Sequence, residues 1–283
     1  MSWYQLTNPG EVISPSLLFY KGRIESNIRS MVNIAGSSGQ RSADRLVPHV
    51  KTHKCPEIVA MQLSAGISKF KCATIAEAEM VATAGAPWVL IAYQLVGPNI
   101  DRLFALRNMF PDTTFASLVD NEQTATLLSE ASRERGLRSA VFLDVNNGMN
   151  RTGHATDESL LSLYRFVSGL DGLSFGGVHI YDGHIRNPEF SERKAAADEA
   201  YEQALPLLDR IETECGYEPM IILENTLCTS QRSSGAGPTR RSPLPRVLAE
   251  IDSDILGENI QCLVIGISPG IAVPPLSRSA WLA

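Results

Sequence analysis

The stretch Pro48-His49-Val50-Lys51-Thr52-His53-Lys54 ends an apolar run, 45–50, and places two lysines and two histidines close together in the chain. The apolar run predicts a β-strand, so Lys51 would stand just beyond its carboxyl end. A lysine amine attacks an aldehyde only when it is deprotonated, and burial or neighbouring positive charge favours that state. The two histidines and Lys54 could supply this charge. The alternative interpretation is a solvated basic turn after a strand.

Outward from this stretch, short β-branched or aromatic runs alternate with longer amphipathic patterns, which indicates βα units around a parallel sheet. Strands are predicted at 16–20, 45–50, 69–73, 88–93, 114–119, 140–145, 174–181 and 220–223. Helices are predicted at 23–34, 56–65, 75–84, 100–108, 122–135, 159–170 and 191–215. This rhythm favours a (β/α)8 TIM-type barrel, complete or incomplete. No Gly-x-Gly-x-x-Gly follows the first strand, so an open dinucleotide-binding sheet has little support.

In a parallel barrel the functional groups gather where the strands end. The polar residues at or just beyond predicted strand ends are Lys51, Thr74, Tyr93, Asp144, Asn146, Arg151, Tyr181, Asp182 and His184. Thr74 has a second interpretation, which we favour, because Glu77 completes a capping box for the next helix. His179 is interpreted as a core-facing strand histidine, and His184 is either a satisfied loop histidine or a site residue.

Composition excludes several classes of protein. A net charge of -6 and a pI near 5.5 argue against a nucleic-acid-binding surface, so a small molecule is the expected partner. Five cysteines without a CxxC pair fit a reducing cytosol better than a disulfide scaffold. No basic and apolar leader begins the chain, and no apolar window reaches about 18 residues. We therefore expect a cytoplasmic protein without a membrane segment.

Four stretches resemble, in order, the barrel motifs of the D-threonine aldolase and D-serine dehydratase-like enzymes. They are the opening stretch, Phe70-Lys71-Cys72-Ala73-Thr74-Ile75-Ala76-Glu77-Ala78-Glu79, Asp144-Val145-Asn146-Asn147-Gly148-Met149-Asn150-Arg151-Thr152-Gly153, and Gly177-Val178-His179-Ile180-Tyr181-Asp182-Gly183-His184. These fold-type III pyridoxal-phosphate enzymes share the barrel of the alanine racemase N-terminal domain. The resemblance covers residues 11–223. It implies pyridoxal 5'-phosphate as cofactor and lyase or aldolase chemistry on D-amino acids with a β-hydroxyl.

The resemblance also assigns residues. Lys51 matches the Schiff-base lysine, with Lys54 as the less favoured rival. Arg151 matches the arginine near the phenolic oxygen of the cofactor, where a guanidinium favours the phenolate. Tyr181 matches the residue that packs on the pyridine face, and the following Asp182-Gly183-His184 is typical of the aldolase-like branch. The implied site comprises Lys51, Arg151 and Tyr181 as catalytic and cofactor-binding residues, with His49 and Thr74 as further cofactor ligands.

Two features depart from the family. Where the family has a Gly-Gly-Thr-like phosphate loop, near Leu223, this chain has Glu224-Asn225-Thr226-Leu227, with Gly235-Ala236-Gly237-Pro238-Thr239 as a glycine-rich alternative. The family also has a C-terminal β-domain whose histidine and cysteine or aspartate bind a divalent metal. No histidine follows His184, so we expect that metal site to be missing.

The chain is therefore divided into a cofactor-binding barrel, 1–224, and an atypical tail, 225–283. Within the tail we expect a loop at 225–245, a helix at 246–255 and a strand at 262–267. The loss of periodicity and resemblance at residue 224 leads to the hypothesis that truncation, altered splicing or a frameshift of a longer ancestor produced this tail.

The expected function is that of a D-threonine aldolase-like lyase impaired by the missing domain, so that aldolase activity is low or absent. The first alternative is a non-catalytic pyridoxal-phosphate barrel, and the second is a relative of D-serine dehydratases or amino-acid racemases. The third is a chain that neither binds the cofactor nor folds stably, because an incomplete barrel exposes strand edges. The expected ligand is a D-amino acid, and a homodimer is the assembly to look for first.

Overall fold

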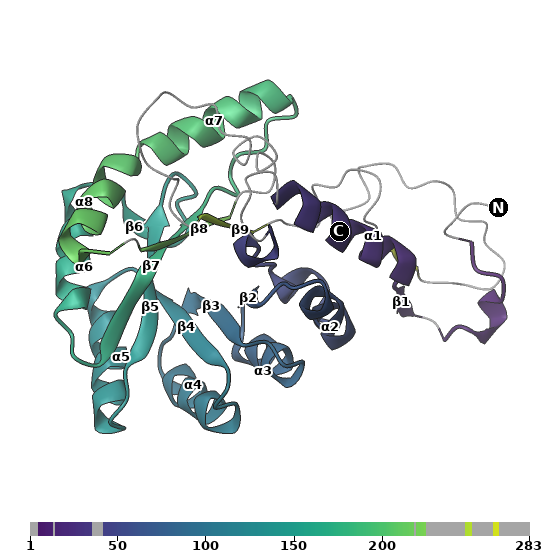
Figure 1. Cartoon of the computed structure of the whole chain (residues 1–283), viewed down its shortest axis with the longest axis horizontal. Coiled ribbons are helices and arrows are strands. Elements are labelled where there is room, and N and C mark those ends of the chain that lie inside the picture. Colours follow the sequence, from purple (N-terminus) through teal and green to yellow (C-terminus); the bar gives the residue numbers. More distant parts are fainter. Residues whose placement is uncertain are drawn as a thin grey trace.

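A curled parallel sheet with helices on its outer face forms the body of the molecule (Figure 1). The computed structural model describes residues 5–13, 15–35, 42–217, 219–224, 247–250 and 263–265. Neighbouring strands pair in parallel in the order β2 (Lys69–Cys72), β3 (Trp88–Gln94), β4 (Thr114–Val119), β5 (Ser139–Asn146), β7 (Leu173–Tyr181), β8 (Met220–Glu224) and β9 (Val247–Glu250). The expectation of an incomplete (β/α) barrel is confirmed.

The helices between these strands also follow the predicted pattern. They are α1 (Lys21–Ala35), α2 (Pro56–Ser64), α3 (Ile75–Thr83), α4 (Pro98–Met109), α5 (Glu122–Glu134), α6 (Glu158–Ser168), α7 (Phe190–Glu202) and α8 (Leu205–Cys215). The single helix predicted at 191–215 is wrong, because the chain breaks between α7 and α8. Pro206 lies in the first turn of α8, where its missing amide hydrogen costs no helical hydrogen bond. No helix of the described part is long and apolar enough to cross a membrane.

The strand predicted at 45–50 is wrong, although the segment still lies at the sheet edge. Short 3-10 helices, η2 (Ser42–Arg45) and η3 (Val50–Thr52), occupy its ends, and His49 forms an isolated parallel bridge with Lys71 of β2. Pro48 has no amide hydrogen to give to a ladder, but its carbonyl accepts the amide hydrogen of Lys71 at 3.0 Å. Since β9 lies beside η2, this segment fills the space between the two edges of the sheet.

Predictions for the tail are partly corrected. The helix predicted at 246–255 is wrong, since Val247–Glu250 forms β9 on the open edge of β8, where pairing overrides local propensity. The strand predicted at 262–267 is confirmed as β10 (Leu263–Ile265). However, β10 pairs antiparallel with β1 (Ser16–Leu18) outside the barrel sheet, so the first predicted strand is not a barrel strand. The predicted loop at 225–245 and its glycine-rich stretch lie outside the described residues.

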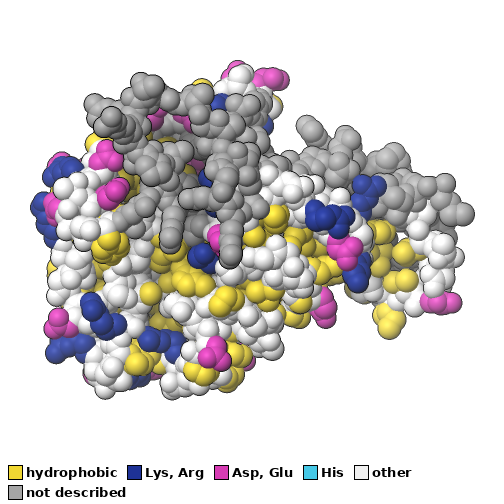
Figure 2. Space-filling view, in the orientation of Figure 1, with side chains coloured by type: hydrophobic (Ala, Val, Ile, Leu, Met, Phe, Trp, Pro, Cys, Tyr) yellow, Lys and Arg dark blue, Asp and Glu magenta, His cyan; other side chains and the backbone are white. Residues whose placement is uncertain are grey.

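Alternation along the strands divides the core into two parts. On the outer face, side chains such as Val89 and Ile91 pack with the helices in the larger cluster. On the inner face, Leu90 and Phe142 belong to a smaller cluster, and the ring of Phe142 meets that of Trp88 edge-on at 5.9 Å between centroids. The inner cluster fills the barrel below the carboxyl ends of the strands. Figure 2 shows hydrophobic side chains toward the centre of the visible face and charged side chains mainly around it.

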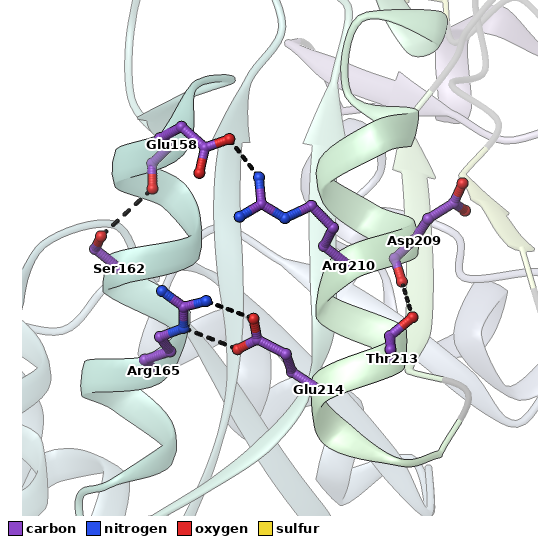
Figure 3. Close-up of polar contacts among 7 residues, drawn as sticks. All are labelled: Glu158, Ser162, Arg165, Asp209, Arg210, Thr213 and Glu214. Carbon is purple, nitrogen blue, oxygen red and sulfur yellow. Dashed lines mark hydrogen bonds and ion pairs between the residues drawn. The ribbon is translucent and has the colours of Figure 1, made fainter.

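Ion pairs join neighbouring helices of the outer layer. Arg165 on α6 binds Glu214 on α8 through two hydrogen bonds, of 2.9 and 2.6 Å, and Arg210 on α8 reaches back to Glu158 (Figure 3). The Arg165 guanidinium holds the pKa of the Glu214 carboxyl below its usual value through these bonds. Both pairs are open to solvent, so they orient α6 and α8 more than they stabilise the fold.

Candidate active site

A pocket opens at the carboxyl end of the curled sheet, with an empty volume of about 430 Å³ that is partly open to solvent. Its polar lining comes from η3, three strands and the loop after β5, and consists mainly of Lys51, Lys71, Asp144, Arg151, His179 and Tyr181. Ala92 and Leu118, from the inner core cluster, form its apolar part. Residues far apart in the sequence therefore meet at the end of the barrel where function was expected.

Lys51 enters this pocket from a short, well-ordered turn. It lies in η3, and His49 caps that helix by accepting the backbone amide hydrogen of Lys51 on Nδ1 at 3.3 Å. His49 is buried, so its ring fixes the backbone from which Lys51 projects. The Lys51 amine lies 5.7 Å from the centre of the Tyr181 ring. His49 and Lys51 therefore both line the pocket, with His49 acting on the backbone of Lys51.

Tyr181 is the centre of the cationic side of the pocket. The guanidinium of Arg151 lies 4.8 Å from the ring centre, and Lys71 adds a third cation at 5.9 Å. An electron-rich ring attracts such cations, which keeps Lys51 and Arg151 close together. Gly183 makes this ring position accessible, because a Cβ there would stand 2.1 Å from the Tyr181 hydroxyl oxygen.

Thr74 and Lys54 lie elsewhere. The Thr74 hydroxyl accepts the amide hydrogen of Glu77 at 3.1 Å at the start of α3, so the favoured capping interpretation is confirmed, and Thr74 is not in the pocket lining. Lys54, the rival lysine, has an exposed side chain whose amine pairs with Glu77 at 3.3 Å. These contacts leave Lys51 as the better placed of the two lysines for chemistry in the pocket.

The structure adds a buried array to which the motifs assigned no role. Lys71 Nζ lies 2.8 Å from His179 Nε2, and His179 Nδ1 lies 2.7 Å from Asp144 Oδ1. Because β2 and β7 are not neighbours in the sheet, this contact crosses the barrel interior. His179 faces the core as predicted, but it also lines the pocket. A signal was present in the sequence, since Lys71 alternates with the apolar Phe70 and Cys72 and so faces the opposite side of the strand.

Further hydrogen bonds hold Asp144 as a carboxylate. Its second oxygen accepts from Gln94 at 3.1 Å, and Gln94 also donates to Asp120 at 2.8 Å. Burial alone would raise the pKa of Asp144, but hydrogen bonds and charge attraction from His179, with bonds from Thr152 and Gln94, lower it below its ordinary value. An ionised Asp144 requires the hydrogen of a neutral His179 ring to lie on Nδ1, an assignment made from this network.

His53 makes folding stability depend on pH. Its Nδ1 accepts the Cys55 amide hydrogen at 3.1 Å, its Nε2 is buried without a hydrogen-bond partner, and burial lowers its pKa from 6.5 to about 4. Since the unfolded chain binds the proton first, the free energy of unfolding falls as the pH drops from 6.5 to 4. The fall should reach about 3 kcal/mol.

His53→Asn keeps an acceptor for the Cys55 amide hydrogen but removes this titration. We expect its unfolding free energy, from urea denaturation at several pH values, to lose the part of the decline that lies between pH 6.5 and 4. Thr52→Ser is the matched control in the same turn and should decline like the wild-type protein. Parallel curves for wild type and His53→Asn would contradict the assignment.

The pocket residues fit pyridoxal phosphate. The Lys51 amine and the Arg151 guanidinium both lie within 6 Å of the centre of the Tyr181 ring. An amine can hold an aldehyde carbon, a guanidinium can face an oxygen anion, and a ring can cover a pyridine. Within the described ranges, no three His, Cys, Asp or Glu side chains lie close enough to hold a metal ion. The expectation about the metal stays a prediction.

Fold-type III pyridoxal-phosphate enzymes are built on a parallel barrel of this kind. The sequence model of the family described as "Alanine racemase, N-terminal domain" matches residues 21–236. The chain belongs to this pyridoxal-phosphate-dependent family, in which its relatives are D-threonine aldolase-like proteins.

Three relatives define this neighbourhood. D-threonine aldolase from Arthrobacter sp. is 31% identical over 188 residues, which cover 65% of this chain and 47% of the relative. 3-hydroxy-D-aspartate aldolase from Paracoccus denitrificans is 31% identical over 209 residues, which cover 72% of this chain and 52% of the relative. The crystal structure of D-threonine aldolase from Filomicrobium marinum superposes with a TM-score of 0.67 at 30% identity. The superposition covers 75% of this chain and 56% of that structure. The chain spans about half the length of the curated relatives it matches.

Proposed function

We propose that this barrel binds pyridoxal 5'-phosphate through Lys51 and serves a lyase reaction on D-amino acids that carry a β-hydroxyl. The observation that carries the proposal is the convergence of Lys51 and Arg151 on the Tyr181 ring inside a pocket at the strand ends. The relatives support the substrate class, since the aldolases named above act on D-threonine and 3-hydroxy-D-aspartate. Both compounds are D-amino acids with a hydroxyl on Cβ.

Each residue has a definite task in this proposal. Lys51 would hold the aldehyde carbon of the cofactor, Tyr181 would cover its ring, and Arg151 would face its phenolic oxygen, where positive charge favours the phenolate. When bound, the cofactor supplies an electron sink for the electron pair released at Cα. His49 keeps the backbone of Lys51 in place by accepting its amide hydrogen. A homodimer and a cytoplasmic location stay predictions, which size-exclusion chromatography and cell fractionation would check.

The test combines binding and turnover. The purified chain is titrated with pyridoxal phosphate, reduced with borohydride and digested, and the modified peptide is sequenced. We expect a visible-edge absorbance band and a single modified residue, Lys51. A modified surface lysine instead would contradict the proposal.

Products separate the candidate reactions. An aldolase converts D-threonine to glycine and acetaldehyde, whereas a dehydratase releases ammonia and a keto acid, so both sets are measured with D-threonine and D-3-hydroxyaspartate and with their L isomers as controls. Cleavage of the D isomers alone supports the proposal. Modified Lys51 without turnover of any D-amino acid would favour the non-catalytic cofactor-binding barrel.

A further inference from the structure

Three buried side chains in the pocket are joined end to end. Lys71 binds His179 at 2.8 Å, and His179 binds Asp144 at 2.7 Å. Lys71 is only 1% exposed, so it is not a surface lysine that happens to reach the site. Lysines are rarely buried to this degree without a specific partner. All three side chains line the same pocket as Lys51.

The positions of the hydrogens follow from the partners. The Asp144 carboxylate accepts the Nδ1 hydrogen of His179, so His179 Nε2 carries the lone pair of the neutral ring and accepts a hydrogen bond from the Lys71 amine. A proton that passes from Lys71 to His179 produces an imidazolium beside a carboxylate, which is a stabilised pair. The array thus has the logic of a Ser-His-Asp triad with an amine in the place of the hydroxyl.

We propose that Lys71 is a second acid–base residue of this site, activated by His179 and positioned through Asp144, and that it exchanges a proton with Cα of the bound amino acid. This inference rests on the proposed function, because the Cα proton becomes acidic only when the amino group is held by pyridoxal phosphate. The other charged or titratable groups around the pocket are Lys51 from η3, His49 from the segment before it, Arg151 from the loop after β5 and Tyr181 from β7.

The proton steps balance without a further reactant. A proton moves from Lys71 Nζ to His179 Nε2, which leaves a neutral amine and an imidazolium whose Nδ1 hydrogen stays on the ring and is donated to the Asp144 carboxylate. Lys71 then takes the Cα proton, and the electron pair of the broken C–H bond stays with the amino acid and its cofactor. In the cleavage direction, the Lys71 ammonium gives a proton to Cα after the Cα–Cβ bond has broken, which completes glycine. The β-hydroxyl loses its proton to solvent as the aldehyde forms, and Lys71 regains one proton from solvent, so the protons balance.

Glycine tests this role, since it is the amino-acid product of every such cleavage and has no side chain to lose. The cofactor-loaded full chain is incubated with glycine in D2O, and deuterium entry at Cα is followed by NMR. Lys71→Arg keeps the positive charge but cannot act as a base, whereas Lys71→Met removes both properties. We expect both variants to exchange at least about 100-fold more slowly. Exchange by Lys71→Arg at the wild-type rate would overturn the proposal.

A second measurement needs no cofactor. Trace acetylation with acetic anhydride at pH 7, followed by peptide mapping, gives the reactivity of Lys71 relative to Lys69 on the same strand. His179→Gln removes the proton acceptor, so we expect this ratio to fall at least about tenfold. His184→Gln changes an exposed histidine outside the array and should leave the ratio unchanged. An unchanged ratio in folded His179→Gln, verified by circular dichroism, would sink the proposal.

The two measurements separate the two claims. If wild-type chain gives no borohydride adduct at Lys51, the proposed function fails, and the acetylation ratio still decides whether His179 activates Lys71. If the adduct forms in wild type and in both Lys71 variants but their exchange is unaffected, the proposed function stands and the acid–base role of Lys71 is wrong.

Discussion

The Lys51→Ala variant is expected to lose all covalently bound pyridoxal phosphate. Lys51 projects into the pocket toward Tyr181 from the turn that His49 caps, and alanine has no group that can hold the cofactor aldehyde. The measurement is the absorbance band of the cofactor complex, followed by borohydride reduction and mass analysis of the intact chain. The added mass should be present in wild type and absent in the variant.

Lys54→Ala is the matched control for this loss. Its side chain is exposed and paired with Glu77, so the variant should keep the wild-type adduct. The two variants thereby distinguish Lys51, which is expected to bind the cofactor, from Lys54, which is not. A trapped adduct that persists in Lys51→Ala, on Lys71 or on any other lysine, would contradict the assignment of Lys51.

The Gly177→Ala variant is expected to unfold the barrel under mild conditions. Gly177 lies in β7 where the register with β5 shifts, and its φ of +149° is one that residues with a Cβ rarely adopt. A Cβ at this position would stand 1.8 Å from the carbonyl oxygen of Met220 in β8. Because the backbone of β7 or β8 must move to make room, we expect the free energy of unfolding to fall by about 4 kcal/mol or more.

Thermal and urea denaturation of Gly177→Ala measure this loss, and the melting temperature should fall by about 10 °C. Gly22→Ala is the matched control. Gly22 lies in the first turn of α1 with nothing within 4 Å of a Cβ built there, so alanine should leave the stability unchanged or raise it by at most about 0.5–1 kcal/mol. A Gly177→Ala protein that melts with the wild type would show that β7 and β8 adjust without strain.

Strand and helix positions in the barrel follow from local patterns. Thr114–Val119 is a strand as predicted, because its β-branched and aromatic residues are bounded by turn signals. The strand predicted at 45–50 and the helix predicted at 246–255 were wrong for different reasons. Pro48 cannot donate a ladder hydrogen bond, and the open edge of β8 draws Val247–Glu250 into the sheet. The periodicity of apolar residues reports neither the missing amide hydrogen of Pro48 nor the open edge of β8.

Four of the five predicted site residues lie together in the pocket lining. His49 and Lys51 lie in the segment that runs along β2, Arg151 lies in the loop after β5, and Tyr181 ends β7. Parallel strands bring their carboxyl ends to one side, so these residues meet there. Thr74 also follows a strand end, but it immediately precedes a helix whose amide hydrogens need an acceptor. Proximity to a strand end thus selects candidates, and local hydrogen bonding decides among them.

Periodicity along the chain predicts the alternation of strands and helices, because that alternation depends on neighbours within a few residues. The four motifs and their order are also present in the sequence, and their resemblance to the family points to Lys51 as the Schiff-base lysine. Only the tertiary structure joined Lys71 to His179, which lie 108 residues apart and on strands that are not neighbours in the sheet. Alternation places a side chain on one face of its strand, but only the curvature of the whole sheet brings two inner faces within hydrogen-bonding distance.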